Sequence, residues 1–236
     1  MKLSQVLFSQ GFGVRRACEA LIVAGQVTLD GQVCDDPDHE VEPQGLVFGV
    51  SGQPWPYHAK ALIVLHKPAG HECSHKPRHH PSVYELLPPP LRARKVQAVG
   101  RLDEDTTGLL LLTDDGALIH RLTSPRHHVP KVYELVCRHP VDAQQVQRLL
   151  DGVQLLDEPG LVRAAACQPT GERSLRLTLT EGKYHQVKRM VAAVGNRVDA
   201  LHRSRFGELD LPPGLAPGQW QWLPGPQVLY PGPGVP

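Results

Sequence analysis

The stretch Gly100-Arg101-Leu102-Asp103-Glu104-Asp105-Thr106-Thr107-Gly108-Leu109-Leu110-Leu111-Leu112-Thr113-Asp114-Asp115-Gly116 places acidic, basic and hydroxyl side chains directly before four consecutive leucines. Such an apolar run predicts a strand that is buried on both faces. A buried strand is a rigid support, so the loop before it holds its side chains in place. Asp103 is therefore a candidate for a positioned, partly desolvated carboxylate that can attack a sugar carbon or a base. The alternative is an ordinary solvated acidic loop.

The segments around this stretch mix strands and helices without a strand–helix–strand rhythm. Residues 62–65 form an apolar run, and apolar residues alternate with polar ones from 175 to 179, as in a strand with one buried face. Apolar residues recur at helical spacing from 187 to 194, and Gly195 then ends the helix. The pattern predicts an α+β catalytic domain over residues 60–223, with a mixed, largely antiparallel sheet flanked by helices.

Residues 1–50 predict a small α/β module. A first helix is followed by a second with an apolar face at Ala17, Ala20, Leu21 and Ala24, and Asp30-Gly31 then marks a hairpin turn. Residues 51–59 are rich in Pro and Gly and predict a linker. Residues 224–236 are also rich in Pro and Gly, without periodicity, and we expect them to be disordered.

Composition sets limits on the class of protein. The formal net charge of +1 divides unevenly, because residues 1–50 carry three Lys and Arg against seven Asp and Glu. Any field that attracts RNA should therefore be local to the larger domain. The five cysteines are scattered without a CxxC pair, which favours reduced thiols. No signal architecture or membrane-length apolar run is present, so we expect a soluble, cytoplasmic protein.

Four segments together resemble one family. The stretch 100–116 is similar to the signature segment of the pseudouridine synthases, in the branch that modifies ribosomal RNA. Three further segments agree with that family in order and spacing: Lys67-Pro68-Ala69-Gly70, the residues 123–133 with Lys131-Val132-Tyr133, and Glu181-Gly182-Lys183-Tyr184-His185-Gln186-Val187-Lys188-Arg189-Met190. The resemblance is strongest to the RsuA type of the RsuA/RluB/RluE/RluF family, and the N-terminal module resembles the S4 RNA-binding domain.

The resemblance implies an activity and a substrate. It implies an isomerase that converts one uridine of 16S ribosomal RNA, nucleotide 516, to pseudouridine, on the RNA alone or within an assembling small subunit. It implies no metal and no organic cofactor, since the rearrangement is redox-neutral and consumes no water. It also implies a monomer with no membrane partner. The S4-like module has few of the basic residues that such modules present to RNA.

The resemblance assigns three catalytic residues. It places the catalytic aspartate at Asp103, and it pairs that carboxylate with a basic residue at Lys188, where Arg189 is the alternative. It gives Tyr133 the role of stacking on the target uracil and assisting proton transfer. On spacing alone, Glu104 and Asp105 are rivals of Asp103. Attack at C1′ of the ribose and attack at C6 of the uracil both remain open.

A second set of residues is expected to bind RNA. Arg101 precedes Asp103 by two residues, and its planar guanidinium could fill the space that a flipped uridine leaves. The remaining RNA-binding candidates are basic or imidazole side chains: Arg15, Arg16, Lys67, Arg126, His127, His128, Lys131 and Arg189.

Three other functions compete with this one. A large-subunit (23S) ribosomal RNA pseudouridine synthase would share most of the motifs. A non-catalytic assembly factor would bind ribosomal RNA through the S4-like module, although that module is weakly basic. A glycoside hydrolase would pair Asp103 with Asp105, yet two carboxylates on one short loop rarely reach the separation of about 5–9 Å that such pairs need.

Overall fold

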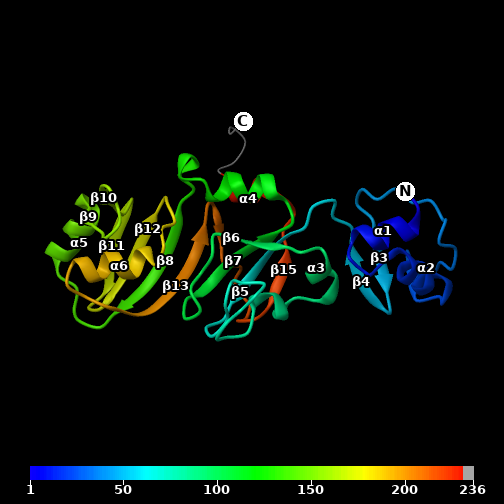
Figure 1. Cartoon of the computed structure of the whole chain (residues 1–236), viewed down its shortest axis with the longest axis horizontal. Helices are drawn as coiled ribbons and strands as arrows, with labels where there is room; N and C mark the ends of the chain where they lie inside the picture. Colours follow the sequence, from blue (N-terminus) through cyan, green and yellow to red (C-terminus); the bar gives the residue numbers. More distant parts are fainter. Residues whose placement is uncertain (231–236) are drawn as a thin grey trace. The chain divides into compact units, whose positions relative to one another are not determined.

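The computed structural model describes residues 1–230, and the chain divides into two compact units. The N-terminal unit contains residues 1–61 and 87–97. The sheet unit contains residues 62–86 and the chain from residue 98 onward (Figure 1). The expected small N-terminal module and larger α+β domain are therefore both present.

The N-terminal unit begins with two helices, α1 (Leu3–Ser9) and α2 (Arg15–Val23). Helix α1 buries one face through Leu3, Val6 and Leu7. Helix α2 buries Cys18 and Ile22, so the predicted alanine-lined face was wrong. The larger Ile22 side chain removes more apolar surface from water than the small alanines would, which sets the rotation of the helix.

A four-stranded antiparallel sheet completes the module. Its strands are β1 (Val27–Leu29), β2 (Gln32–Val33), β3 (Val47–Val50) and β4 (Gln53–Pro56), in the order β2-β1-β3-β4. The predicted hairpin turn between β1 and β2 is confirmed. Asp30 and Gly31 have φ angles of 48° and 79°, the left-handed conformation that tight hairpin turns require.

Strand β4 lies in the segment that the sequence predicted to be a linker, residues 51–59, so that prediction was wrong. Trp55 is buried, and the ring of Phe12 packs edge-on against it at a centroid separation of 5.2 Å. Pro54 is tolerated because β4 is an edge strand, where one side of the backbone needs no ladder hydrogen bond. Burial of one large aromatic side chain therefore outweighs the local preference for a loop.

The short helix α3 (Pro89–Ala93) also belongs to the N-terminal unit, which interrupts the predicted continuous domain over residues 60–223. Arg94 donates hydrogen bonds of 2.8 Å to Oε1 of Gln10 and to the carbonyl of His58. The Gln10 side chain is fully buried and also donates to His58. These contacts between distant segments could not be read from local sequence.

The sheet unit contains one nine-stranded sheet, whose main path runs β11-β12-β8-β13-β7-β5-β15, with β14 paired to β13 and β6 paired to β7. Its strands are β5 (Leu62–Lys67), β6 (Gln97–Val99), β7 (Thr107–Thr113), β8 (Lys131–Cys137), β11 (Ala166–Gly171), β12 (Ser174–Leu179), β13 (Val198–Phe206), β14 (Leu209–Asp210) and β15 (Trp220–Trp222). Along the main path all pairings are antiparallel except the parallel pairing of β13 with β7. The mixed, largely antiparallel sheet is confirmed.

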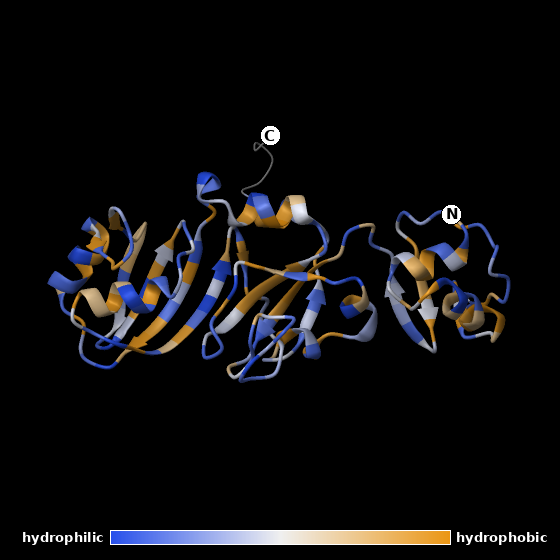
Figure 2. Ribbon diagram, in the orientation of Figure 1, coloured by the Kyte–Doolittle hydropathy of each residue, from blue (hydrophilic) through white to orange (hydrophobic). Residues whose placement is uncertain are grey.

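Strand β7 is buried on both faces, as the leucine run predicts. All four leucines from 109 to 112 are fully buried. Leu109 and Leu111 pack in one core cluster with residues such as Val64 and Phe206. Figure 2 shows the hydrophobic residues concentrated in the central strands of this sheet.

A close approach between β7 and β13 depends on Gly108. Its φ angle is 106°, and a Cβ atom at this position would lie 2.3 Å from the carbonyl oxygen of Arg203. A side chain cannot be accommodated there. The glycine therefore lets β13 pair with the start of β7, next to the loop that carries Asp103.

Helices pack against this sheet: α4 (Gly116–Thr123) contacts β7, α5 (Ala143–Asp151) contacts β11, and α6 (Gln186–Ala193) contacts β13 (Figure 1). Asp115 caps α4 by accepting from the amides of Ala117 and Leu118. A two-stranded sheet of β9 (Val153–Gln154) and β10 (Leu161–Val162) and the 3₁₀ turns η1 (Val83–Leu86) and η2 (Pro125–His127) complete the unit. Within residues 1–230, every helix is too short or too polar to span a bilayer.

The segment after residue 223 was predicted to be disordered, and for its first part that prediction was wrong. Residues Pro226–Leu229 form the 3₁₀ helix η3, and Leu229 is buried in the core cluster with Phe206. The apolar side chain holds this Pro- and Gly-rich segment against the sheet. Residues 231–236, the rest of the predicted tail, lie outside the described residues.

Candidate active site

A cleft of about 890 Å³ opens in the sheet unit, and several chain segments line it. They include the loop after β5, the loop before β7, the first residues of β8, the segment that leads into α6, and residues of β13. The titratable and cationic residues that line it include Arg101, Asp103, Lys131, Tyr133, His185, Lys188 and Arg203. All three residues predicted to be catalytic therefore lie in one cleft.

Lys67 holds the loop that carries Asp103 in place through hydrogen bonds to its backbone. Its ammonium donates to the carbonyls of Pro68, Glu104 and Thr106, at 3.0, 3.0 and 2.8 Å. The Lys67 side chain is fully buried, and burial lowers its pKa. The prediction that Lys67 binds RNA was wrong, because a buried ammonium saturated by three carbonyls cannot reach a phosphate. Its position instead makes the loop rigid.

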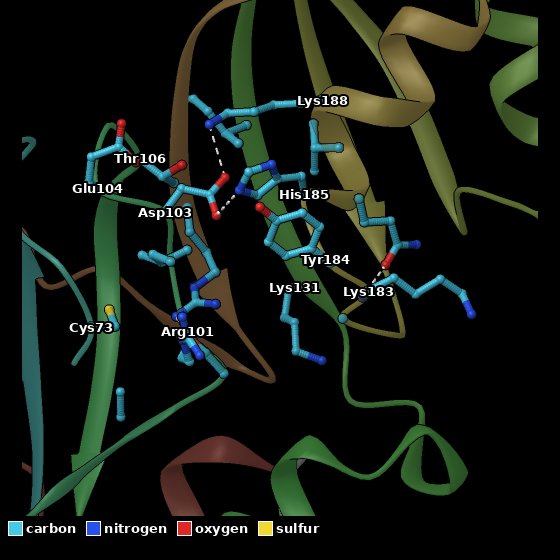
Figure 3. Close-up of a pocket in the computed structure, with 18 of the residues that line it drawn as sticks. Cys73, Arg101, Asp103, Glu104, Thr106, Lys131, Lys183, Tyr184, His185 and Lys188 are labelled. Atoms are coloured by element: carbon cyan, nitrogen blue, oxygen red, sulfur yellow. Dashed lines mark hydrogen bonds and ion pairs between the residues drawn. The ribbon is translucent and has the colours of Figure 1, made fainter. Parts of the chain in front are cut away.

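Two cationic or potentially cationic side chains contact the Asp103 carboxylate (Figure 3). The Lys188 ammonium lies 2.9 Å from Oδ2, and Nε2 of His185 lies 3.3 Å from Oδ1. The Asp103 side chain is 24% exposed, so it is partly desolvated yet open to the cleft. The arrangement can present a fixed carboxylate oxygen to a group bound in the cleft.

Lys188 also binds Asp105, at 2.6 Å from Oδ1. Burial opposes ionisation of Asp105, but the hydrogen bond and charge of Lys188 outweigh it, so the pKa of Asp105 lies below its ordinary value. Burial likewise disfavours the charged form of Lys188, yet its hydrogen bonds to Asp105 and Asp103 raise the pKa of this lysine. The ammonium thus stays charged between two carboxylates. Asp105 is exposed and is absent from the residues that line the cleft, whereas Asp103 lines it.

Tyr133 and Lys131 lie on the same face of β8, where the pairwise alternation of a strand directs both into the cleft. Both side chains are buried. The Lys131 ammonium donates to the Val129 carbonyl at 2.9 Å and lies 5.2 Å from the centre of the Phe206 ring. Burial is the main reason that the pKa of Lys131 falls to about 8. Lys131 was predicted to bind RNA. Because its side chain is buried, it can contact only a part of the RNA that enters the cleft.

Arg203 was not found by sequence analysis. Its side chain is buried beneath the cleft and donates to the carbonyls of Leu109 (2.8 Å) and Gly100 (3.1 Å). It lies over the Phe206 ring at 5.3 Å. The sequence offers no local signal for this role, because Arg203 lies in an alternating strand whose pairing with β7 is set by the tertiary fold.

His185 was also missed, although a signal for it existed. It lies three residues before Lys188, and this spacing places two side chains on the same face of a helix. His185 is the N-terminal cap residue of α6, with a φ angle of 47°. This left-handed conformation is uncommon for a non-glycine residue, and it occurs where the ring contacts Asp103.

The structure separates the remaining predicted RNA-binding residues. Arg101 is exposed and lines the cleft. Arg126, His127 and His128 are exposed on and after the η2 turn, outside the cleft lining. Arg15 and Arg16 are exposed at the start of α2 in the N-terminal unit.

Arg189 does not support the predicted role. Its guanidinium donates to the carbonyls of Tyr184, at 3.2 Å, and Leu156. It is therefore neither the partner of Asp103 nor directed at the cleft. The choice between Lys188 and Arg189 that the sequence left open is decided by the geometry in favour of Lys188.

A basic loop at the cleft rim is organised by Glu72. Its carboxylate accepts hydrogen bonds from the backbone amides of Arg78, His79 and His80, at 3.1, 2.8 and 3.0 Å. These bonds lower the pKa of Glu72 below its ordinary value. His79 and His80 line the cleft. The three hydrogen bonds thus hold the backbone of this loop in place at the cleft.

Comparison with known proteins places this site in a family. The model of the RNA pseudouridylate synthase family matches residues 61–193, and that of the S4 domain matches residues 1–47. The chain is 43% identical over 224 residues to the ribosomal small subunit pseudouridine synthase A of Yersinia pestis, with 94% of each chain covered. It is 40% identical over 230 residues to the enzyme of that name from Escherichia coli K12, with 94% of this chain and 96% of the other covered.

A solved structure agrees with these matches. A crystal structure of a pseudouridylate synthase is 32% identical in sequence and superimposes with a TM-score of 0.67, covering 94% of this chain and 96% of the other. The predicted fold and the predicted family are both confirmed. The chain belongs to the RNA pseudouridylate synthase family, as an RsuA-type member with an N-terminal S4 domain.

Proposed function

We propose that the chain converts a uridine of 16S ribosomal RNA to pseudouridine, at nucleotide 516. Relatives about 40% identical over nearly the full chain are small-subunit enzymes, which favours this substrate over 23S ribosomal RNA. The observation that carries the catalytic assignment is the Asp103 carboxylate, held by Lys188 and His185 inside a cleft of the sheet unit.

The reaction exchanges one bond for another. The bond from ribose C1′ to uracil N1 breaks, the uracil turns, and C1′ forms a bond to C5. The hydrogen on C5 leaves as a proton and N1 gains a proton, so atoms and electrons balance without an external oxidant. Asp103 supplies the carboxylate that attacks C1′ or C6, because it lines the cleft and its two oxygens contact Lys188 and His185.

Lys188 and His185 act as positioning residues for this carboxylate. Each contacts a different oxygen of Asp103, so together they restrict its rotation. Lys188 supplies a positive charge beside the carboxylate. Asp105 in turn holds the far side of the Lys188 ammonium.

Tyr133 is the residue that we assign to the base itself. Its ring stacks on the uracil, and its hydroxyl assists proton transfer at C5. Lys131 and the buried Arg203 lie in the same cleft and supply positive charge to the detached uracil, whose oxygens carry negative charge. A preorganised field of this kind stabilises the intermediate without rearrangement of solvent.

Access to the uridine requires base flipping, which costs a few kcal/mol of unstacking. Arg101 is exposed at the cleft and is the candidate to occupy the vacated stack. Arg126, His127 and His128 are candidates for phosphate contacts on the sheet unit, and Arg15 and Arg16 on the N-terminal unit. We expect the protein to act as a monomer in the cytoplasm, on ribosomal RNA or an assembling small subunit.

The test is to map pseudouridine in 16S ribosomal RNA from cells that lack the gene. The modification at position 516 should be missing, and it should return with the wild-type gene but not with an Asp103→Asn variant. The pseudouridines in 23S RNA of the same cells should be retained, and they serve as the check on substrate class. Loss of a 23S pseudouridine with an intact 16S site would contradict the proposal.

A further inference from the structure

Tyr184 is an exposed aromatic side chain at the active-site cleft that the proposed chemistry does not use. Its residue is 75% exposed, among the highest values of the large apolar and aromatic residues, yet it lines the cleft. One face of its ring stacks on His185, with ring centres 3.8 Å apart and planes inclined by 19°. With this high exposure, the ring retains a surface that a planar ligand can cover.

The turn that carries Tyr184 is held on several sides. Arg189 donates to the Tyr184 carbonyl at 3.2 Å, and the Lys183 amide donates to Oε1 of Gln186 at 2.8 Å. The Lys183 ammonium binds Glu158 at 2.7 Å. A fixed aromatic ring loses little conformational entropy when it binds a ligand. The exposed ring is therefore preorganised.

The position of the ring selects the ligand. A single imidazole, that of His185, separates the Tyr184 ring from the Asp103 carboxylate. Figure 3 shows Tyr184 beside His185 at the same cleft. Arg101, His79 and His80 also line this cleft, and such a rim suits a polyanion. RNA meets both requirements, because each nucleotide joins a planar base to a negatively charged phosphate.

We propose that the Tyr184 ring is a stacking platform for the base of a nucleotide adjacent to the flipped uridine. The proposal rests on the proposed RNA-modifying function and specifies how that site holds its substrate. Base–aromatic stacking in single-stranded recognition contributes about 1–3 kcal/mol per base. Removing the ring should therefore weaken RNA binding by about 5- to 150-fold. The platform places the strand, and Asp103 acts on the neighbouring nucleotide.

The experiment measures binding of a 16S RNA stem-loop that carries the target uridine. Three further versions of this RNA lack the base on the 5′ neighbour, on the 3′ neighbour, or on a distant loop nucleotide. All proteins carry Asp103→Asn, so that turnover does not change the RNA during the measurement. Tyr184→Ala, Tyr184→Phe and Leu156→Ala are compared in this background.

Leu156 provides the matched control. It is 83% exposed, and its carbonyl is held by the same Arg189, but it does not line the cleft. Leu156→Ala should leave binding unchanged. Tyr184→Phe should bind like its parent, because it keeps the ring, whereas Tyr184→Ala should lose affinity for the intact RNA. On one of the two RNAs that lack a neighbouring base, Tyr184→Ala and its parent should bind with equal affinity, because the base that stacks on the ring is missing.

Three results would overturn the platform. They are no loss with Tyr184→Ala, an equal loss on all four RNAs, or a loss with Tyr184→Phe as large as that with alanine. Pseudouridine formation by the protein with native Asp103 on the same stem-loop is measured separately. Absence of product there would contradict the proposed function, while the binding data would still decide the role of Tyr184.

Discussion

Residues 1–50 and the sheet unit hold their positive charge in different ways. In residues 1–50 the only Lys and Arg residues are Lys2, Arg15 and Arg16. Lys2 is paired with Asp38 at 3.0 Å, and the two arginines are exposed. In the sheet unit, by contrast, Lys67, Lys131 and Arg203 are buried around the cleft, and Lys188 is held between two carboxylates.

This contrast shows that the net charge of a segment does not indicate where the active site lies. A cation that is buried or paired in a setting of low polarity interacts with a nearby charge much more strongly than it would in water. An exposed arginine is screened by salt and contributes modestly. We therefore expect substitutions at the cleft to change the rate strongly, and substitutions on the N-terminal unit to change RNA capture weakly.

The largest effect is expected for Asp103→Asn. The variant keeps the shape of the side chain but removes the nucleophilic charge, so turnover should fall by about 10⁴-fold or more, with RNA affinity retained. Single-turnover assays and equilibrium binding measure the two quantities. If a preparation whose sequence is confirmed as Asp103→Asn still forms appreciable product, Asp103 is not the catalytic carboxylate.

The next effect is expected for Lys188→Met. It leaves Asp103 with only His185 and removes a partly buried positive charge, so the rate should drop by about 10²- to 10³-fold. Lys188→Arg, which keeps the charge, should recover part of the rate. If RNA affinity falls instead while the rate at saturating RNA is kept, Lys188 is a phosphate contact. That result would contradict the expectation that substitutions at the cleft act mainly on the rate.

A moderate, pH-dependent effect is expected from Lys131, whose pKa is about 8 because of burial. As pH rises through 8, the ammonium loses its charge, so the rate at saturating RNA should fall by up to about tenfold. Lys131→Met should have a low rate that does not change across this window. Lys60→Met, an exposed lysine of the N-terminal unit, serves as the control and should keep the wild-type profile.

The same lysine should affect stability in the opposite direction. Since its pKa in the folded chain lies below the ordinary value of 10.5, the folded chain binds fewer protons than the unfolded chain between about pH 8 and 10.5. The free energy of unfolding should therefore gain a rising contribution across this window. Denaturant unfolding at several pH values should show that Lys131→Met loses this contribution; an unchanged slope would contradict the burial of its charge.

The smallest effect is expected for Arg15→Gln combined with Arg16→Gln. RNA binding should weaken only a few-fold, and the slope of log affinity against log salt should decrease by up to about 2. Turnover at saturating RNA should not change. A loss as large as that from Lys188→Met would show that the N-terminal unit contributes to the chemical step. Point variants suit this test better than deletion, since Gln10 makes buried contacts with residues 58 and 94.

The sequence by itself determined the elements whose signals are local. The leucine run predicted β7, the hairpin turn predicted β1 and β2, and the motif residues Asp103, Tyr133 and Lys188 converge on one cleft. The two strand predictions rest on a physical signal within a short segment: an apolar run, or a turn whose residues adopt the left-handed conformation. The three motif residues were assigned by the family resemblance.

Only the tertiary structure decided the features that depend on distant partners. Burial of Lys67 requires two carbonyls from the loop that carries Asp103, and the position of Arg203 requires a parallel pairing of β13 with β7. Trp55 and Leu229 ordered two Pro- and Gly-rich segments by inserting into cores that neighbouring residues do not reveal. The physical reason is shared: the free energy of burial depends on the atoms that surround a side chain, and those atoms come from segments far away in the sequence.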